Sequence, residues 1–245
     1  MTGGRSSRRA RATPTASAPV EPRLVDLTAP VEDYLKAIYD IELSESAAAT
    51  NDIAHRLQIA PASVTGMVRR LAEQGLLAYE RYRGARLTDA GRRAALRTIR
   101  RHRVIESYLV KALGYPWDQV HPEAERLEHA ASDELIDRMA AAIGEPLTDP
   151  HGAPIPTRDG VIDETRHNSL ADIASGGKAR IVRVGDENDE MLRYLDSLGI
   201  RPGVIVTLGG RAPFEGPLTV RVGSAVHQVG YALAAKILVE SLSSA

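Results

Sequence analysis

The stretch that decides the fold is Arg101–His129, RHRVIESYLVKALGYPWDQVHPEAERLEH. In its first half, His102 and Glu106 stand four residues apart, so one helical turn brings both side chains to the same face. In its second half, imidazoles and carboxylates recur about one helical turn apart: Glu125 stands four residues after His121, three before Glu128 and four before His129. A single pair of this kind is typical of a solvated helix face. Six such residues on two consecutive helices indicate a metal site.

Length and composition limit the class of protein. With 245 residues the chain can form two or three domains, each with its own core. Because there is no cysteine, the sequence excludes disulfides, thiolate ligands and nucleophilic thiols. It has no apolar run of the roughly 18 residues that a membrane span requires, and its N-terminus lacks the apolar core of a signal peptide. We therefore expect a cytoplasmic protein with no membrane partner.

Charge is divided along the chain, although the total is only −1. Residues 51–103 hold twelve arginines, no lysine and four acidic residues, whereas residues 104–245 hold 13 basic and 21 acidic residues. A basic block favours binding to nucleic-acid phosphates, and an acidic remainder favours binding to a cation. This partition favours a DNA-binding part followed by a metal-binding part.

The N-terminal part predicts a winged helix-turn-helix. Residues 1–25 contain almost no large apolar side chains and are expected to form a disordered tail. Within the expected DNA-binding domain, residues 26–97, we predict helices at 30–43, 50–57 and 61–74. The short turn between the second and third helices is typical of a helix-turn-helix, and two strands around Arg83-Gly84 would form the wing.

The expected recognition helix begins at Pro61. Polar side chains in its first turns can reach base edges, and small apolar ones can contact thymine methyl groups. These predicted base contacts are Ser63 and Thr65, with Ala60 and Pro61 as the apolar pair. Phosphate contacts are predicted for the arginines of the helix and wing, namely Arg69, Arg70, Arg81 and Arg83.

Residues 98–150 are predicted to form a helical dimerisation and metal-binding domain. A long helix capped by Thr88 would run to Leu113, followed by helices at 116–132 and 133–143. The long helix bears more apolar residues than such short partners can cover, which predicts a homodimer. A dimer of winged helices would suit a palindromic operator, because its two halves meet the DNA with twofold symmetry.

The C-terminal part of the chain has the sequence pattern of β-strands. Residues 151–168 are expected to be a linker, because this segment is rich in proline, aspartate and glycine. In residues 169–245, apolar residues alternate between glycines, which predicts a small barrel of five or six strands with helices at 190–198 and 231–238. The acids at 186–190 would either supply further oxygen ligands or serve a helix N-terminus.

Several of these segments resemble the diphtheria-toxin-repressor family of metal-dependent transcriptional repressors, in its manganese-responsive three-domain type. The similar segments are VEDYLKAIYDIE (31–42), HRVIE (102–106), VHPEAERLEH (120–129), HGAPIP (151–156) and LGIRPG (198–203). The resemblance covers nearly everything after the N-terminal tail. It implies a mainly α fold with a small all-β domain: an N-terminal winged helix-turn-helix, a helical dimerisation domain and a C-terminal SH3-like barrel.

The resemblance also implies two metal sites. The primary site would unite the first helix with the dimerisation domain, through Asp33, Glu125, Glu128 and His129, with the backbone carbonyl of Glu125. The ancillary site would be His102, Glu106 and His121, completed by one or two acids of the SH3-like domain, with Glu187 and Glu190 as the candidates. Arg103 matches an anion-contacting position of the family.

Departures from the family pattern bear on the metal. Asp33 and Glu125 stand where iron-responsive members have methionine and cysteine, and carboxylates with one imidazole suit a harder ion such as Mn²⁺. Fe²⁺ is the alternative cofactor. Lys36 stands where shorter, two-domain manganese regulators carry an acid, which argues against a closely coupled two-metal cluster.

The function implied is a manganese-dependent, or also iron-responsive, repressor that controls metal-ion uptake genes. Metal would tie the DNA-binding domain to the dimer axis through Asp33, and without metal the clustered carboxylates would repel one another. One alternative is an iron-dependent repressor of the same family, and another is a metal-independent winged-helix repressor with an organic effector. We predict no enzymatic activity and no organic substrate, because the sequence shows neither the paired Glu-x-x-His of di-iron bundles nor a nucleophile with its base.

Overall fold

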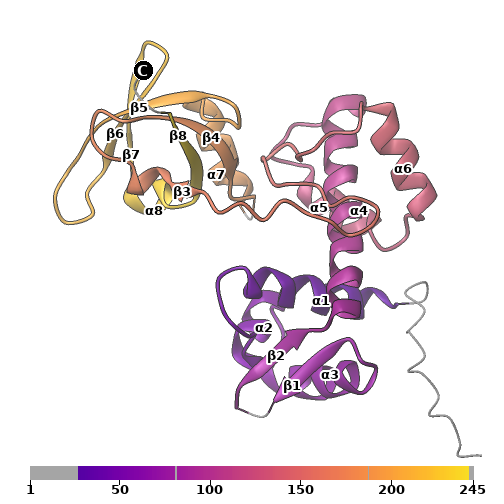
Figure 1. The fold of residues 1–245 in the computed structure, drawn as a ribbon. Helices are drawn as coiled ribbons and strands as arrows, with labels where there is room; N and C mark the ends of the chain where they lie inside the picture. The colour runs from indigo at the N-terminus through magenta and orange to yellow at the C-terminus, as the bar shows by residue number, and fades with distance from the viewer. Residues whose placement is uncertain (1–26, 81, 187, 243–245) are drawn as a thin grey trace, which may run out of the picture.

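The computed structural model describes residues 27–80, 82–186 and 188–242 (Figure 1). An N-terminal unit of three helices and a two-stranded wing is joined by one long helix to a second helical unit, and a barrel of β-strands follows. The predicted fold class, mainly α with a small all-β domain at the C-terminal end, is confirmed. The expected disordered tail, residues 1–25, lies outside the described residues.

The N-terminal unit contains α1 (Ala29–Glu42), α2 (Thr50–Leu57) and α3 (Pro61–Glu73). Helix α2 ends at Gln58, whose left-handed backbone (φ 54°) turns the chain so that Pro61 can open α3 soon afterwards. Strands β1 (Leu77–Glu80) and β2 (Gly84–Leu87) pair antiparallel as the wing. The apolar faces of these elements share one core, in which the largest buried side chains include Leu35, Tyr39, Ile53 and Leu71.

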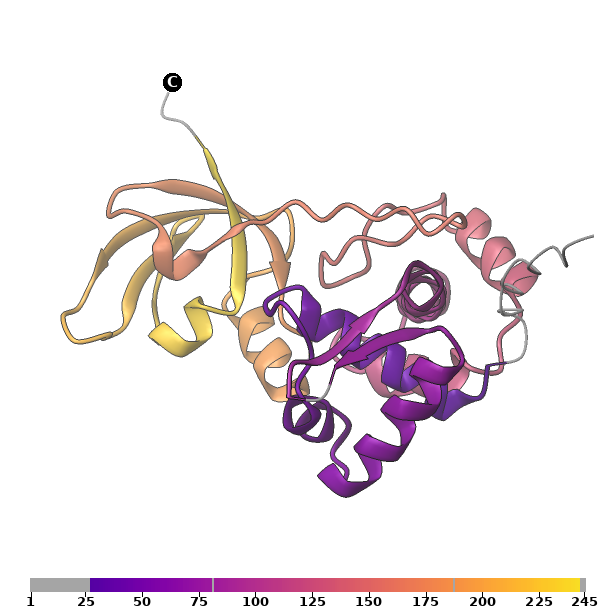
Figure 2. The same ribbon diagram turned by 60° about the horizontal axis from the view of Figure 1, so that its bottom comes forward.

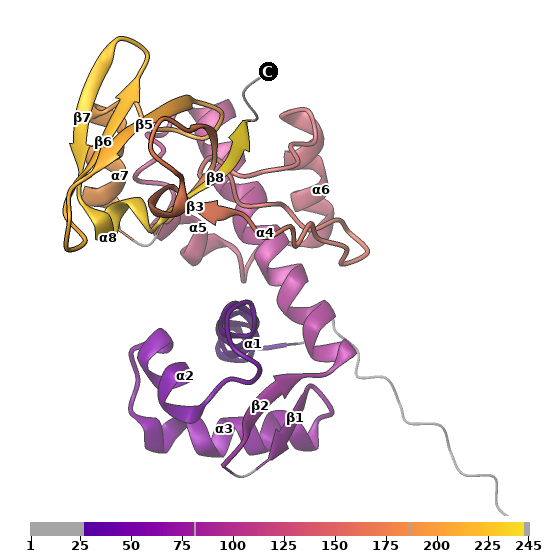
Figure 3. The same cartoon turned by 60° about the vertical axis from the view of Figure 1, so that its left-hand side comes forward.

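Helix α4 (Asp89–Leu113) runs from the wing into the second helical unit (Figure 3). As predicted, Thr88 caps it, because its hydroxyl accepts a hydrogen bond of 3.1 Å from the backbone N–H of Gly91. Its first half buries Leu96 and Ile99 in the N-terminal core, and its second half buries Val104 and Leu109 in a separate core. The expectation that the long helix cannot cover such apolar residues within one chain is therefore wrong, because the N-terminal core and the short helices cover them. Neither α4 nor any other helix among the described residues combines the length and apolarity needed to cross a membrane.

The helix expected at residues 116–132 is much shorter in the structure. Helix α5 spans only His121–Leu127, with Pro122 in its first turn, and α6 (Asp133–Ala142) follows as expected. A proline is favoured in the first turn, where its missing N–H costs nothing. Residues 116–120 instead form turns that send Trp117 away from the helical unit, into the core of the barrel.

The C-terminal barrel is a six-stranded sheet in the order β3-β8-β4-β5-β6-β7, and every pairing is antiparallel. Its elements are β3 (Asn168–Ser169), a 3-10 turn at Leu170–Asp172, β4 (Lys178–Val184), α7 (Asp189–Ser197), β5 (Ile205–Arg211), β6 (Leu218–Val222), β7 (Ala225–Val229), α8 (Tyr231–Ala234) and β8 (Ile237–Leu242). The helix expected at 231–238 is wrong in its second half. Ile237 and Val239 belong to β8 and fill the barrel core, so tertiary pairing overrides the helical pattern there.

Trp117 anchors the barrel to the helical unit. Its ring is 4% exposed, stacks on His151 with a centroid distance of 5.6 Å, and lies under the guanidinium of Arg201 at 4.9 Å. Arg193 of α7 adds an ion pair of 3.2 Å to Asp118. Figure 2 shows the segment before β3 as an extended chain that runs from the α6 side of the molecule to the barrel.

Candidate metal centre

The first group of metal-ligand residues lies where α1 faces the end of α5. Asp33 projects from α1, and its Oδ1 atom lies 2.9 Å from Nε2 of His129. Oε1 of Glu128 lies 3.5 Å from the same nitrogen. Each of these three side chains offers a ligand atom within 4.8 Å of the other two. Three of the four residues predicted for the primary site are therefore neighbours, and they join the DNA-binding unit to the second helical unit.

Glu32, which the sequence did not single out, orients His129. Its Oε2 atom lies 2.6 Å from Nδ1 of the imidazole, so Nε2 faces Asp33 and Glu128. Arg101 donates a hydrogen bond of 3.1 Å to the other oxygen of Glu32. A carboxylate on the far nitrogen is the usual support for a metal-binding histidine, because it sets the orientation of the ring and raises its basicity. Glu32 and its neighbour Asp33 both carry a carboxylate, and only the packing distinguishes their roles.

The fourth predicted residue, Glu125, turns toward Lys36 of α1. The ammonium donates to Glu125 Oε1 at 2.6 Å and to both oxygens of Glu128 at 3.1 Å. Nδ1 of His102 lies 3.7 Å from Glu125 Oε1 and also contacts Glu128 Oε2. Glu125 thus belongs with His102 and Glu128, in a second group of possible ligands that shares Glu128 with the first.

Positive groups balance the negative charge of this ligand cluster, Asp33, Glu125, Glu128 and His129. Burial raises the pKa of Asp33, His129 opposes that shift, and Glu125 and Glu128 add to it. Burial would lower the pKa of His129, but the hydrogen bond to Glu32 and the charge of Asp33 raise it. The repulsion expected among the carboxylates is present, since Glu125 and Glu128 act on Asp33 in that sense, and Lys36 and His129 lie among the carboxylates and oppose it. That this repulsion moves the DNA-binding unit without metal stays a prediction.

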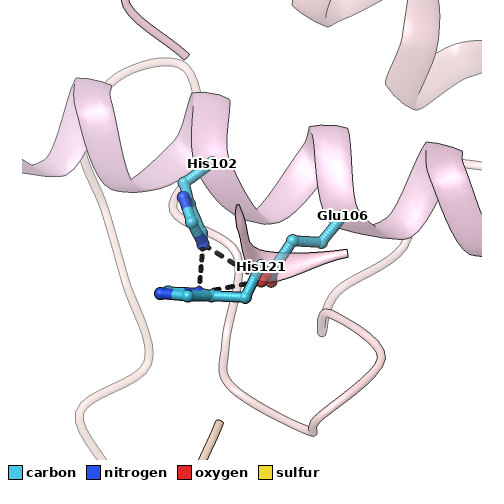
Figure 4. A group of neighbouring side chains, drawn as sticks. All are labelled: His102, Glu106 and His121. Carbon is cyan, nitrogen blue, oxygen red and sulfur yellow. Dashed lines mark hydrogen bonds and ion pairs between the residues drawn. The ribbon is translucent and has the colours of Figure 1, made fainter. Parts of the chain in front are cut away.

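The residues predicted for the ancillary site also come together (Figure 4). Nε2 of His102 lies 3.0 Å from Glu106 Oε1 and 3.1 Å from Nδ1 of His121, which is itself 3.3 Å from Glu106 Oε1. His102 and Glu106 lie one turn apart on α4, and His121 begins α5, as the spacing predicted. Burial would lower the pKa of His102, but hydrogen bonds to Glu106 and Glu128 raise it to about 9.

A further group, Glu106 with Asp149 and His151, was missed by the sequence analysis. All three are buried, and three of their atoms have no hydrogen-bond partner: Glu106 Oε2, Asp149 Oδ2 and His151 Nδ1. Unpaired buried polar atoms are costly, and a cation would satisfy the two carboxylates and the imidazole. Asp149 and His151 lie in the segment 143–167, which has no periodicity, so a search for helical spacing could not find them. One feature of the sequence could have indicated this group. An acid and a histidine stand close together in Asp149-Pro150-His151, where the HGAPIP segment begins.

Arg103, the predicted anion contact, lies beside this group. Its guanidinium donates to the carbonyl of Pro154 at 2.5 Å and lies 3.6 Å from Asp149 Oδ2. Burial and the charge of Glu106 raise the pKa of Asp149 to about 6, although Arg103 opposes that shift. The guanidinium is thus directed at protein groups of the helical unit.

The acids predicted to complete the ancillary site are less closely placed. Glu190 is exposed in the first turn of α7 and belongs to none of the four ligand groups formed by the described residues. Glu187 lies outside the described residues. Asp186, from the same barrel segment, is close enough for its charge to raise the pKa of both Asp149 and His151. The barrel therefore approaches the buried group Glu106–Asp149–His151 through Asp186.

The predicted DNA-contacting residues lie on one helix and the wing. Ala60, Pro61 and Ser63 are exposed at the start of α3, and Thr65 is half-buried in its second turn. Arg69 and Arg70 are exposed later on the same helix. In the wing, Arg83 is exposed and pairs with Glu80 at 3.1 Å, whereas Arg81 lies outside the described residues.

Comparison with protein families divides the chain into three matching segments. Residues 26–85 match the N-terminal DNA-binding domain of iron-dependent repressors, and residues 88–157 match their metal-binding and dimerisation domain. Residues 168–241 match the FeoA domain.

Individual proteins agree with these matches. The chain is 33% identical over 199 residues to the iron-dependent repressor IdeR of Mycobacterium leprae, which covers 75% of this chain and 85% of the relative. It is 36% identical over 113 residues to the HTH-type transcriptional regulator MntR of Lysinibacillus sphaericus, covering 46% of this chain and 81% of the relative. Among solved structures, a manganese-dependent transcriptional repressor in complex with manganese is 39% identical with a TM-score of 0.81, covering 86% of this chain and all of the other. ScaR with bound Zn²⁺ is 31% identical with a TM-score of 0.75 and covers 86% of this chain and 99% of that structure.

Proposed function

Because this chain belongs to the diphtheria-toxin-repressor family of iron-dependent repressors, we propose that it is a metal-dependent transcriptional repressor activated by Mn²⁺, with Fe²⁺ as the alternative ion. The observation that carries the proposal is the contact of Asp33 on α1 with His129 beyond α5. A cation bound by Asp33, Glu128 and His129 would hold the DNA-binding unit against the second helical unit.

The chemistry of the side chains favours manganese. The ligand cluster offers carboxylates and imidazoles, and the chain has no cysteine thiolate that would favour softer ions. When bound, the metal ion supplies positive charge and directed coordination bonds between the two units. The residues that would hold it are Asp33, Glu128 and His129, with Glu125 beside them; the groups around Glu106 would hold an ancillary ion.

Metal and DNA are coupled through the position of α1. If the metal-bound arrangement of the two units is also the one that fits DNA, each ligand strengthens the binding of the other by the same factor. Exposed residues at the start of α3 would contact bases, and Arg69, Arg70 and Arg83 would contact phosphates. The genes controlled would then be those for metal-ion uptake.

We propose that the chain acts as a cytoplasmic homodimer on a palindromic operator. The second helical unit leaves several apolar side chains exposed in the single chain, namely Leu113, Tyr115, Leu127 and Leu135, as expected of a surface that a second copy covers. The domain limits that follow are 26–97 for DNA binding, 98–150 for dimerisation and metal binding, 151–168 for the linker and 169–245 for the SH3-like barrel.

A titration of Mn²⁺ against DNA binding tests the proposal. The DNA would be selected from a random-sequence library by the manganese-saturated wild-type protein. Glu128→Ala and His129→Ala are expected to require at least about 100-fold more Mn²⁺ than wild type, since each loses a ligand. Glu134→Ala, which removes an exposed carboxylate of α6, should behave like wild type. A wild-type response in both ligand variants would refute the primary site, and DNA binding unaffected by a chelator would favour the metal-independent repressor.

A further inference from the structure

A pocket lined by arginines lies between α4, α6 and the turn at residues 157–160. Its volume is about 310 Å³, which is large enough for a small organic molecule. None of its lining residues in the described chain belongs to a candidate metal-ligand group, to α3 or to the wing. The pocket is therefore separate from the metal ligands and from the surface proposed to contact DNA. Four of its five arginines come from α4 and the fifth from the turn: Arg93, Arg97, Arg100, Arg101 and Arg158.

The arginines of α4 form a stripe along the helix. Arg97 follows Arg93 by four residues and Arg101 follows Arg97 by four, so one helix face carries all three. Arg97 and Arg101 both pair with Asp133 of α6, at 2.7 and 3.0 Å. One aspartate thus serves two guanidinium groups.

The turn at residues 157–160 supplies the remaining arginine. Thr157 and Val161 fix this turn, because the backbone N–H of Thr157 donates to the Val161 carbonyl at 2.8 Å and the N–H of Val161 donates to the Thr157 hydroxyl at 3.0 Å. Arg158 pairs with Asp137 at 2.6 Å, and Arg100 of α4 pairs with the same carboxylate at 3.0 Å. A second aspartate of α6 thus serves two guanidinium groups.

Positive charge in the pocket exceeds negative charge. The two aspartates of α6 serve two arginines each, and Asp159 is the third carboxylate of the lining. Arg93 has no ion pair or hydrogen-bond partner within the part of the chain that the structure describes. Glu32 pairs with Arg101 from outside the pocket and offsets only one charge. Guanidinium groups gathered in this way repel one another, and a bound anion would relieve that repulsion.

The arrangement favours a phosphate monoester over other small anions. Its three terminal oxygens are tetrahedral and can accept hydrogen bonds from guanidinium groups in different planes, whereas a carboxylate offers two oxygens in one plane. The pocket is larger than a phosphate group, and Ile136 of α6 adds an apolar side chain to its lining. An organic group attached to the phosphate therefore has both room and apolar contact.

We propose that this pocket is a binding site for a small phosphate monoester, with Arg93 and Arg158 as its main phosphate-binding residues. Both have donors to spare, because Arg93 is unpaired among the described residues and Arg158, which has five N–H groups, donates to Asp137. Arg103 is no part of this site, since its guanidinium is directed at other groups of the helical unit. The protein would thus have a small-molecule ligand besides the metal ion and DNA.

Isothermal titration of phenyl phosphate into the full-length, metal-free protein tests the proposal; metal is left out because Mn²⁺ would itself bind phosphate. One molecule per chain is expected to bind. Phenol, which lacks the phosphate, should not bind. Phthalate, which keeps the ring and two negative charges but presents planar carboxylates, should bind at least about tenfold more weakly. Amide hydrogen exchange at residues 157–160 should slow when phenyl phosphate binds.

Arg93→Ala and Arg158→Ala are each expected to weaken the affinity for phenyl phosphate by about tenfold, since each loses a charge-assisted hydrogen bond. Arg93→Ala breaks no ion pair or hydrogen bond of the described chain, so it should keep the fold even if Arg158→Ala does not. Arg101 is left intact because it also supports the primary metal ligands through a carboxylate of α1. Arg138→Ala is the matched control, because this exposed arginine of α6 lies outside the pocket.

Three results would overturn the proposal. One is the absence of phenyl phosphate binding to the wild-type protein. Another is wild-type affinity in both Arg93→Ala and Arg158→Ala; loss of binding in Arg69→Ala with Arg70→Ala would then locate the phosphate on α3. The third is equal affinity for phthalate and phenyl phosphate, which would show that the pocket selects charge and not phosphate geometry.

Discussion

At the scale of single residues, the charge of the ligand cluster depends on which side chain neutralises which carboxylate. Glu128 is buried between Lys36 and two histidines, so its charge is matched on every side before any metal binds. Asp33 is half-buried and faces only His129 at close range. An incoming ion would therefore find one carboxylate already fixed in place and one that is freer to adjust. This combination allows binding without large reorganisation of the ligand cluster.

We expect the hard oxygen ligands of Asp33 and Glu125 to set the metal preference. Replacing them together, as Asp33→Met with Glu125→Cys, introduces soft sulfur ligands and should shift the ratio of Fe²⁺ to Mn²⁺ affinity toward iron by at least about tenfold. Anaerobic competition titrations with the two ions measure the ratio. Asp33→Asn with Glu125→Gln serves as the control, because it weakens both ions without adding sulfur. An unchanged ratio in the sulfur variant would contradict the assignment of these two side chains as determinants of selectivity.

At the scale of elements, the segment between α6 and β3 does more than connect domains. Its first part buries Asp149 and His151 beside Glu106. Farther along, Ile162 packs against the N-terminal core, and Glu164 accepts a hydrogen bond of 3.0 Å from the hydroxyl of Tyr39. Arg92 of α4 pairs with the same carboxylate and lies over the Tyr39 ring at 5.1 Å. The segment predicted as a linker is therefore docked on α1 and α4, the helices that carry Asp33, His102 and Glu106 of the candidate ligand groups.

Loss of the Glu164 carboxylate should loosen this segment. In Glu164→Ala the contacts with Tyr39 and Arg92 disappear, and cleavage by trypsin after Arg166 should become about three to ten times faster, equivalent to roughly 1 kcal/mol of local stability. Asp163→Ala is the matched control, because Asp163 contacts Thr165 within the segment and neither α1 nor α4. Equal cleavage rates in the two variants would show that the contacts of Glu164 do not fix the segment to α1 and α4.

At the scale of the whole molecule, three units are joined by a small number of contacts. Helix α4 is shared by the first two cores, while Trp117 of the second unit is buried in the third. The Trp117 carbonyl lies 2.8 Å from Nε2 of His151, so the residue that holds the barrel also orients a possible metal ligand. Docking of the barrel and the buried group around Glu106 therefore depend on the same contact.

Removing the Trp117 ring should release the barrel from the helical unit. Trp117→Ala empties a buried position, at a cost of about 3–5 kcal/mol, and the radius of gyration from small-angle X-ray scattering should increase while the barrel keeps its strand content. Phe214→Ala is the control, since that ring is 99% exposed at the turn between β5 and β6 and touches no core. A compact Trp117→Ala protein would show that other contacts, such as Arg193 with Asp118, hold the barrel without Trp117.

Local sequence was sufficient to predict the helices, the wing and the stripe of ligands. Pro61, Thr88 and Gly114 mark helix ends because each acts on the backbone beside it, and His102 and Glu106 share a face because helical spacing places them there. The three residues predicted for the ancillary site, and three of the four predicted for the primary site, do come together, but His121 joins the α4 pair and Asp33 joins Glu128 and His129 only through the packing of separate helices. The helix predicted at 116–132 was wrong at both ends, at 116–120 and 128–132, and the helix predicted at 231–238 was wrong at 235–238. At 116–120 and 235–238 a long-range contact overrode the local pattern.

By itself, then, the sequence determined which elements form, which residue types face the dimerisation helices and which family the chain resembles. Only the tertiary structure decided that Lys36 contacts both Glu125 and Glu128. It also decided that Asp149 and His151 lie beside Glu106, and that Trp117 is buried in the core of the barrel. The physical reason is the same in each case. Lys36 and Glu125 are 89 residues apart in the chain, and the attraction between them depends on the packing of α1 against α5, which no local periodicity encodes.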